Sequence, residues 1–243
     1  MSLISARSLT RSYGDEVAVA RLDLDVMGGE VHALVGLNGA GKTTLMRMLM
    51  GMIRPDSGVV LLDGTEVVDA PASTWARVGH LIETPFGYPE LTVRENVRLA
   101  ARLHGMARDV SVAAADEVIS RFELTHWADR RARALSLGNR QRLGLACAMV
   151  HSPRIVVLDE PSNALDPAGV VFMRDLLRRE AEAGAGILVS SHHLDELARV
   201  ANRISVMHRG RLVGSIDPYG MDLERRFFDM VHEAETRLGG LHA

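Results

Sequence analysis

Short runs of apolar residues recur along the chain, and each run ends in polar or glycine-rich sequence. The clearest runs cover residues 31–35, 78–82, 155–158 and 187–189. Runs of this length, bounded by polar residues, are typical of strands buried in a parallel sheet. Residues 44–50 instead have helical character, which stops at Gly51. The alternation predicts an α/β fold in which functional residues follow the carboxyl ends of the strands.

A long helical stretch separates the runs at 78–82 and 155–158. It covers about residues 91–151, and a capping box from Thr92 to Glu95 predicts its first helix. Breaks between helices are expected at 108–111 and 125–131. We interpret the stretch as a helical lobe inserted into the α/β domain. Beyond it, a strand is expected at 212–216 and a short polar helix that ends near Gly239.

Composition narrows the class of protein. A chain of 243 residues with 47% hydrophobic content can bury a full core. The apolar runs are too short to span a membrane, and the basic N-terminus has no apolar signal segment, so we expect a cytoplasmic protein. A net charge of −3 gives no general reason to bind nucleic acid. The single cysteine, Cys147, cannot form an internal disulfide and is expected to pack in a helix.

Candidate chemistry begins after the run at 31–35, in a glycine-rich segment that opens a helix. Its pattern matches the phosphate loop G-x-x-x-x-G-K-[ST], in which backbone N–H groups surround an anion. The nucleotide-binding candidates are Gly36, Leu37, Asn38, Gly39, Ala40, Gly41, Lys42, Thr43 and Thr44. We expect Lys42 to contact the β and γ phosphates of ATP and Thr43 to hold Mg²⁺. Lys42 is the only lysine among 28 basic residues, which indicates that a compact ammonium is needed there.

Two carboxylates, Asp159 and Glu160, follow the run at 155–158. Beside a phosphate loop, Asp159 is expected to steady the metal ion and Glu160 to polarise the attacking water. The alternative interpretation is an acidic pair on the surface at the end of a strand.

The remaining landmarks resemble those of the ABC ATPase family, in the expected order along nearly the whole chain. Residues 135–139, followed by 140–142, resemble the family's signature sequence at the start of a helix. The resemblance implies that Ser136 and the backbone of Leu137 and Gly138 meet the γ-phosphate bound by an opposite subunit. Taken alone, Ser136 is a helix cap.

Three further residues take their roles from the same resemblance. Asp166 lies in a segment similar to the D-loop, and it also looks like the N-cap of a helix with Pro167 at its first position. His192 resembles the switch histidine that orients Glu160 and water. Tyr13 resembles the aromatic residue that stacks on adenine, a contact worth about 1 to 3 kcal/mol by analogy with base stacking.

The chain also departs from the family pattern. Glu83 stands where most members have a glutamine that contacts Mg²⁺ and the attacking water. Leu137 replaces a signature glycine, and Asn139 replaces a glutamine. Glu83 and Leu137 together resemble the bacitracin and lantibiotic self-protection branch of the exporters. The added charge of Glu83 is expected to favour Mg²⁺ and to repel the γ-phosphate.

The resemblance implies a phosphate-loop NTPase with a RecA-like core, an inserted α-helical subdomain and a small antiparallel β subdomain. Its expected bounds are about 1–88 and 152–216 for the core, 89–151 for the helical subdomain and 217–243 for a C-terminal helical tail. The implied function is ATP hydrolysis that powers export, of an antimicrobial peptide or a drug first of all. The implied partners are a second ATPase subunit, identical or related, and a membrane-spanning subunit that holds the chain at the inner face of the membrane. Helices of this membrane subunit are expected to dock near residues 83–91 and the helical lobe. A non-transport ABC ATPase acting on ribosomes or DNA is the alternative.

Overall fold

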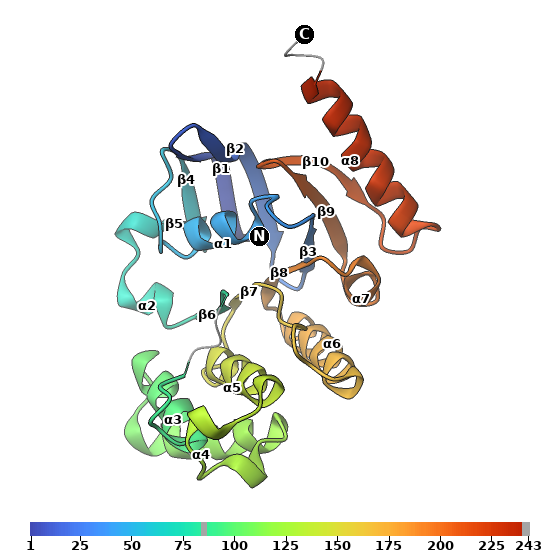
Figure 1. Ribbon diagram of the computed structural model, residues 1–243. Helices are drawn as coiled ribbons and strands as arrows, with labels where there is room; N and C mark the ends of the chain where they lie inside the picture. The colour runs from blue at the N-terminus through green and yellow to red at the C-terminus, as the bar shows by residue number, and fades with distance from the viewer. Residues whose placement is uncertain (84–86, 240–243) are drawn as a thin grey trace.

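A six-stranded sheet forms the centre of the computed structural model, which describes residues 1–83 and 87–239 (Figure 1). Its strand order is β10-β9-β3-β8-β7-β6. The five strands from β9 to β6 are parallel, and β10 is antiparallel to β9. The strands are β3 (Val31–Val35), β6 (Val78–Leu81), β7 (Ile155–Leu158), β8 (Gly186–Ser191), β9 (Arg203–His208) and β10 (Arg211–Ile216). The predicted parallel sheet is present.

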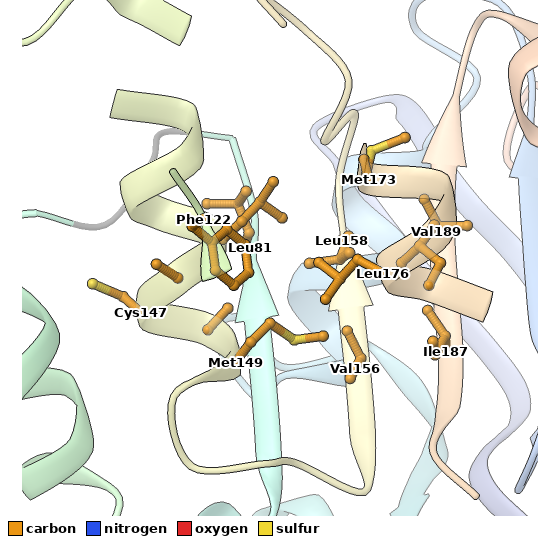
Figure 2. Close-up of a cluster of buried hydrophobic side chains, with 14 of the residues drawn as sticks. Leu81, Phe122, Cys147, Met149, Val156, Leu158, Met173, Leu176, Ile187 and Val189 are labelled. Carbon is orange, nitrogen blue, oxygen red and sulfur yellow. The ribbon is translucent and has the colours of Figure 1, made fainter. Parts of the chain in front are cut away.

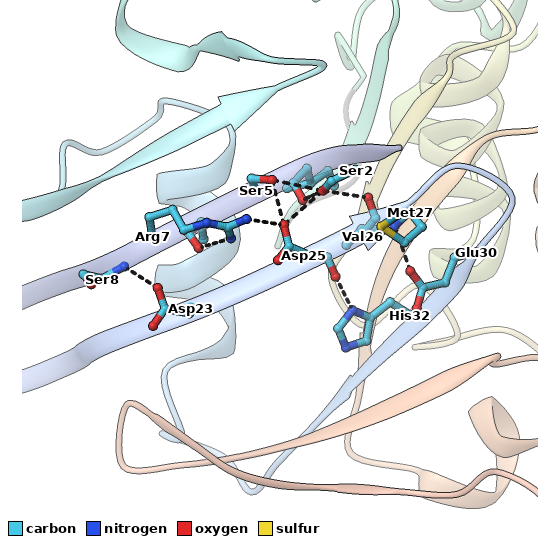
Figure 3. A network of polar contacts seen from close by, with 12 residues as sticks. Ser2, Ser5, Arg7, Ser8, Asp23, Asp25, Val26, Met27, Glu30 and His32 are labelled. Atoms are coloured by element: carbon cyan, nitrogen blue, oxygen red, sulfur yellow. Dashed lines mark hydrogen bonds and ion pairs between the residues drawn. The ribbon is translucent and has the colours of Figure 1, made fainter.

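A second sheet of four antiparallel strands packs against the first and is formed almost entirely by the N-terminal sequence. Its order is β2-β1-β4-β5, from β1 (Ser2–Tyr13), β2 (Glu16–Met27), β4 (Ser57–Leu62) and β5 (Thr65–Glu66). A polar network joins the two sheets (Figure 3). His32 on β3 lies 3.0 Å from the Asp25 carbonyl oxygen on β2 and 2.8 Å from Ser205 Oγ on β9. Burial, together with the nearby Arg203, lowers the pKa of His32 to about 4.

Helices cover the central sheet and fill the long connection between β6 and β7. The helices are α1 (Lys42–Leu49), α2 (Ala72–Trp75), α3 (Val93–Leu103), α4 (Arg108–Arg121), α5 (Leu137–Met149), α6 (Pro167–Glu182), α7 (Leu194–Ala198) and α8 (Leu223–Gly239), with short 3-10 helices at Val67–Asp69, Thr125–Trp127 and Ala132–Ala134. The capping box is confirmed, since Thr92 Oγ1 accepts from the Glu95 N–H and Glu95 accepts from the Thr92 N–H at 2.7 Å.

The break expected at 108–111 was wrong, because these residues form the first turn of α4. The helix begins after Ala107, which offers no side-chain cap, and its first turn is polar. It therefore lacks the serine, threonine, aspartate or asparagine cap that usually marks a helix start. The break at 125–131 is present as a 3-10 turn and loop.

The apolar core has two parts, one on each face of the central sheet. Because side chains alternate along a strand, Val156 and Leu158 face α5 and α6, whereas Ile155 and Val157 face α1 and the antiparallel sheet. Figure 2 shows part of the first face, where Leu176 of α6 meets the strands. Cys147 lies in this cluster, and burial raises its pKa to about 12, so the thiol packs as an apolar group.

Among the residues that the structure describes, no helix is long and apolar enough to cross a membrane.

Candidate nucleotide-binding site

The phosphate loop connects β3 to α1, as predicted. Gly39 and Gly41 have left-handed backbone conformations, with φ of 80° and 102°. A side chain on Gly41 would also collide with the carbonyl oxygen of Ala18. Because the residue before α1 is a glycine, no side chain caps the helix, and its first N–H groups remain available to an anion.

Lys42 is held beneath this loop, with only 6% of its surface exposed. Its ammonium donates to the Gly36 carbonyl oxygen at 2.6 Å and lies 3.5 Å from Glu160 Oε1. A buried ammonium between a carbonyl and a carboxylate is fixed in place and supplies positive charge at the loop.

Asp159 connects the phosphate loop to two strands. Its Oδ2 accepts a hydrogen bond from Thr43 Oγ1 at 2.7 Å, and its Oδ1 accepts one from Ser190 Oγ at 2.5 Å. The same serine oxygen accepts the N–H of Glu160 at 2.9 Å. Ser190 thus fixes both carboxylate residues at the end of β7. Ser190 was not predicted from the sequence, where it directly follows the apolar run at 187–189.

The oxygen donors of this cluster suit Mg²⁺. A hydroxyl and a carboxylate lie within hydrogen-bond distance, and Mg²⁺ commonly takes one or two protein oxygens together with phosphate and water. Within residues 1–83 and 87–239, no group of three histidine, cysteine, aspartate or glutamate side chains could hold a metal ion alone. A bound Mg²⁺ would therefore take most of its ligands from the nucleotide and water.

Glu160 and His192 meet across the strand ends. Glu160 has a left-handed backbone (φ 49°), which turns the chain sharply after β7. His192 Nδ1 lies 2.6 Å from Glu160 Oε2, and the His192 N–H donates to the same oxygen at 3.3 Å. A carboxylate held from one side by an imidazole and from the other by an ammonium has a defined direction, as a general base requires.

These side chains open on one cleft of about 480 Å³. It is lined by Tyr13, Glu16, Ala18, Asn38, Gly39, Ala40, Gly41, Lys42, Thr43, Thr44, Glu160, Asn163 and His192. Tyr13 is 46% exposed, so part of its ring surface is available to a flat ligand. The Arg11 guanidinium lies 4.9 Å from the ring centroid. Asn163 and Glu16 line the cleft without having been predicted from the sequence.

Two predicted phosphate-loop residues lie elsewhere. Gly36 and Leu37 line a neighbouring cleft, and the Leu37 side chain is 44% exposed. At Gly36 a Cβ would collide with the Met207 carbonyl oxygen. Gly36 therefore allows the loop to leave β3 close to β9, and its carbonyl oxygen holds the Lys42 ammonium.

The signature residues form a separate cleft of about 360 Å³ at the start of α5, with Arg142, Ala164 and Asp166. Ser136 caps the helix, accepting the Asn139 N–H at 3.3 Å. A Cβ on Gly138 would approach the Ala164 carbonyl oxygen to 2.8 Å, whereas Leu137 is 57% exposed. Leu137 therefore points outward, and none of the three signature residues is among those that line the nucleotide cleft.

Asp166 is the N-cap of α6, as predicted, and accepts the Gly169 N–H at 2.8 Å with Pro167 at the first helical position. Arg142 Nη2 lies 3.5 Å from its carboxylate. This ion pair thus joins the N-cap of α6 to α5, the helix that begins with the signature residues.

Glu83 does not line the nucleotide cleft. Its backbone is left-handed (φ 60°), its side chain is 47% exposed, and it pairs with Arg47 on α1. The guanidinium of Arg47 balances the negative charge of Glu83. Residues 84–86, part of the region expected to dock the membrane partner, lie outside the described residues.

The fold and the cleft define a phosphate-loop nucleotide-binding protein. A family model described as ABC transporter matches residues 19–163. The chain belongs to the ABC transporter family and carries its ATP-binding domain.

The relatives agree with this assignment. The chain is 36% identical over 216 residues to the bacitracin transport ATP-binding protein BcrA of Bacillus licheniformis, covering 88% of this chain and 70% of the relative. It is 35% identical over 238 residues to the daunorubicin resistance ATP-binding protein DrrA3 of Streptomyces coeruleorubidus, covering 97% and 75%. A solved ATP-binding subunit of an ABC transporter superposes with a TM-score of 0.83 at 28% identity, over 95% of both chains. The predicted fold, and the likeness to the bacitracin branch, are confirmed.

Proposed function

We propose that this chain hydrolyses ATP and that the hydrolysis drives export of an antimicrobial peptide or drug-like compound through a separate membrane-spanning subunit. The observation that carries the proposal is the convergence of Lys42, Thr43, Glu160 and His192 on one cleft. The names of two relatives, one a bacitracin transport protein and the other a daunorubicin resistance protein, support a transport role and this class of substrate.

In this proposal, the N–H groups of the phosphate loop and the Lys42 ammonium hold the β and γ phosphates. Thr43 and Asp159 hold Mg²⁺, which would neutralise charge on the phosphates. Glu160 accepts a proton from the attacking water, and His192 keeps its carboxylate aimed at the cleft. Tyr13 stacks on the adenine.

We further propose that the working unit is a dimer of ATPase subunits, identical or related. Ser136 and Gly138 line a cleft of their own and Leu137 is exposed beside it, so in a single chain these residues leave the phosphates bound from one side. A second subunit that presents its signature residues would supply helix N–H groups to the γ-phosphate. Because a Cβ on Gly138 would collide with the Ala164 carbonyl oxygen, the glycine allows the signature residues to lie close to the segment that resembles the D-loop.

The chain would divide into a nucleotide-binding core (about 1–88 and 152–216), a helical subdomain (about 89–151) and a C-terminal helical tail (217–243). The helical subdomain and the segment from 83 to 91 are the proposed docking region for the membrane subunit, which would hold the chain at the inner face of the membrane. This region lies between β6 and β7 in the chain, where Glu83 follows β6 and Asp159 follows β7.

Purification of the tagged chain from native membranes in mild detergent tests the transport assignment. We expect a protein with several membrane spans to co-purify, and its identity would narrow the substrate. Recovery with ribosomes or DNA, and without such a membrane protein, would contradict the proposal.

A further inference from the structure

A second cleft shares His192 with the nucleotide cleft. Its volume is about 330 Å³, and three segments form its walls: the start of the phosphate loop, the segment that follows β8, and the first turns of α8. Figure 1 shows α8 beside β10, on the side of the molecule away from the helices between β6 and β7. Nothing in the proposed ATPase cycle uses this cleft.

Aromatic and aliphatic side chains form much of its surface. Phe227 and Phe228 of α8 are in edge-to-face contact, with ring centroids 5.3 Å apart, and Leu37 and Leu194 also line the cleft. Phe228 is 58% exposed and Leu37 44%, so apolar surface is available to a ligand.

The charged groups of the cleft are acidic. Asp195, Glu196 and Glu224 line it, and its lining among the described residues includes no lysine or arginine. Glu196 Oε2 is buried and has no hydrogen-bond partner among the described residues. A buried carboxylate oxygen without a partner is costly, and a cation brought close to it would offset the cost.

An apolar wall combined with an uncompensated carboxylate selects for one class of ligand. We propose that this cleft binds a small organic cation, an ammonium group on an aromatic or aliphatic body, with the body against Phe227 and Phe228 and the charge toward Glu196. Acids of the same shape are excluded by repulsion from the three carboxylates.

Occupancy of the cleft would reach the nucleotide site through a shared residue. His192 lines both clefts, and its Nδ1 holds Glu160 at 2.6 Å. A ligand that shifts this imidazole changes the direction of the Glu160 carboxylate. By reciprocity, nucleotide bound beside Glu160 would change the affinity for the cation.

Calorimetric titration of the nucleotide-free, full-length chain with 2-phenylethylamine tests the proposal without reference to ATP hydrolysis. We expect binding of the amine and none of 3-phenylpropionate, which has a similar body and the opposite charge. Glu196→Gln, which removes the charge at nearly constant shape, should weaken the amine roughly tenfold. Phe228→Ser should weaken it as well.

Glu233→Gln is the matched control, because Glu233 lies on the same helix, is exposed and pairs with Arg237. It should bind the amine as the unaltered chain does. Thermal unfolding of each variant verifies that the fold is kept. Failure of the unaltered chain to bind the amine, equal binding of 3-phenylpropionate, or unchanged affinity in Glu196→Gln would overturn the proposal.

Discussion

Lys42 shows how much one residue type can indicate. Every other basic side chain is an arginine, yet this position keeps an ammonium, and the structure places it 6% exposed between Gly36 and Glu160. A planar guanidinium is larger and presents its donors in a fixed fork, so it does not fit the same contacts.

Replacing Lys42 tests this interpretation. Lys42→Ala should weaken ATP binding by roughly 10- to 100-fold, because a charged hydrogen-bonding partner of the phosphates is lost. Lys42→Arg keeps the charge and should still weaken it. Fluorescence titration with a labelled ATP analogue measures both, and full affinity in Lys42→Arg would show that charge alone is sufficient.

Ser190 was not predicted, because a serine inside an apolar run carries no chemical signature. Its role depends on β8 lying beside β7, which brings its hydroxyl to Asp159 and to the Glu160 N–H. Ser190→Ala should lower Mg²⁺ affinity or activity roughly 10- to 100-fold, as loss of a supporting hydrogen bond to a metal ligand commonly does. Mg²⁺ titration of ATPase activity measures this. Ser111→Ala, which removes a buried hydroxyl in α4, is the control, and an equal loss there would assign the effect to stability.

Glu83 pairs with Arg47, so its charge is already balanced in the absence of nucleotide. We expect Glu83→Gln to retain ATP binding and to change either the rate of ATP hydrolysis or the dependence of that rate on Mg²⁺ concentration. If neither changes, Glu83 is a bystander and the departure from the family's glutamine is neutral.

At the scale of elements, the sequence predicted best where its patterns are local. The strands β3, β6, β7 and β8 are apolar runs, and the phosphate loop and the Thr92 capping box are short motifs, so they required no knowledge of tertiary contacts. The paired strands β1 and β2 were expected only from the family resemblance. Their register shifts at several points, and Ser8 and Arg21 have left-handed backbones, which interrupts the alternation that marks a strand.

Two histidines, the buried His32 and the partly buried His151, are expected to make the stability of the fold depend on pH. Burial lowers the pKa of both His32 and His151 to about 4, from an ordinary value of 6.5. Between these values the unfolded chain binds more protons than the folded chain, so the free energy of unfolding should fall as pH drops from about 6.5 to 4.

Urea unfolding across this range measures the effect, with pH 8 as the baseline. His151 stacks on His104, with ring centroids 3.7 Å apart, so His151→Phe keeps an aromatic ring and removes the titration. The variant should lose less stability on acidification than the unaltered chain. An equal loss in both would exclude His151 as a cause.

At the scale of the whole molecule, the proposed dimer completes the nucleotide site with a second subunit, because the signature cleft and the nucleotide cleft of one chain are separate. With Mg²⁺ and ATP, the Glu160→Gln variant should sediment as a dimer, because bound ATP is not consumed. Addition of Gly138→Asp should leave it monomeric, since a side chain at Gly138 meets the Ala164 carbonyl oxygen and the charge opposes phosphate. A dimer that persists with Gly138→Asp, or that forms without nucleotide, would contradict this arrangement.

The most direct test of the proposed ATPase is to measure nucleotide binding and hydrolysis together in Glu160→Gln. We expect ATP affinity close to that of the unaltered chain and a hydrolysis rate lower by roughly 10²- to 10⁴-fold, the usual value of a positioned base. Unchanged hydrolysis would remove Glu160 from the chemistry, and with it the interpretation of this cleft as the site of ATP cleavage.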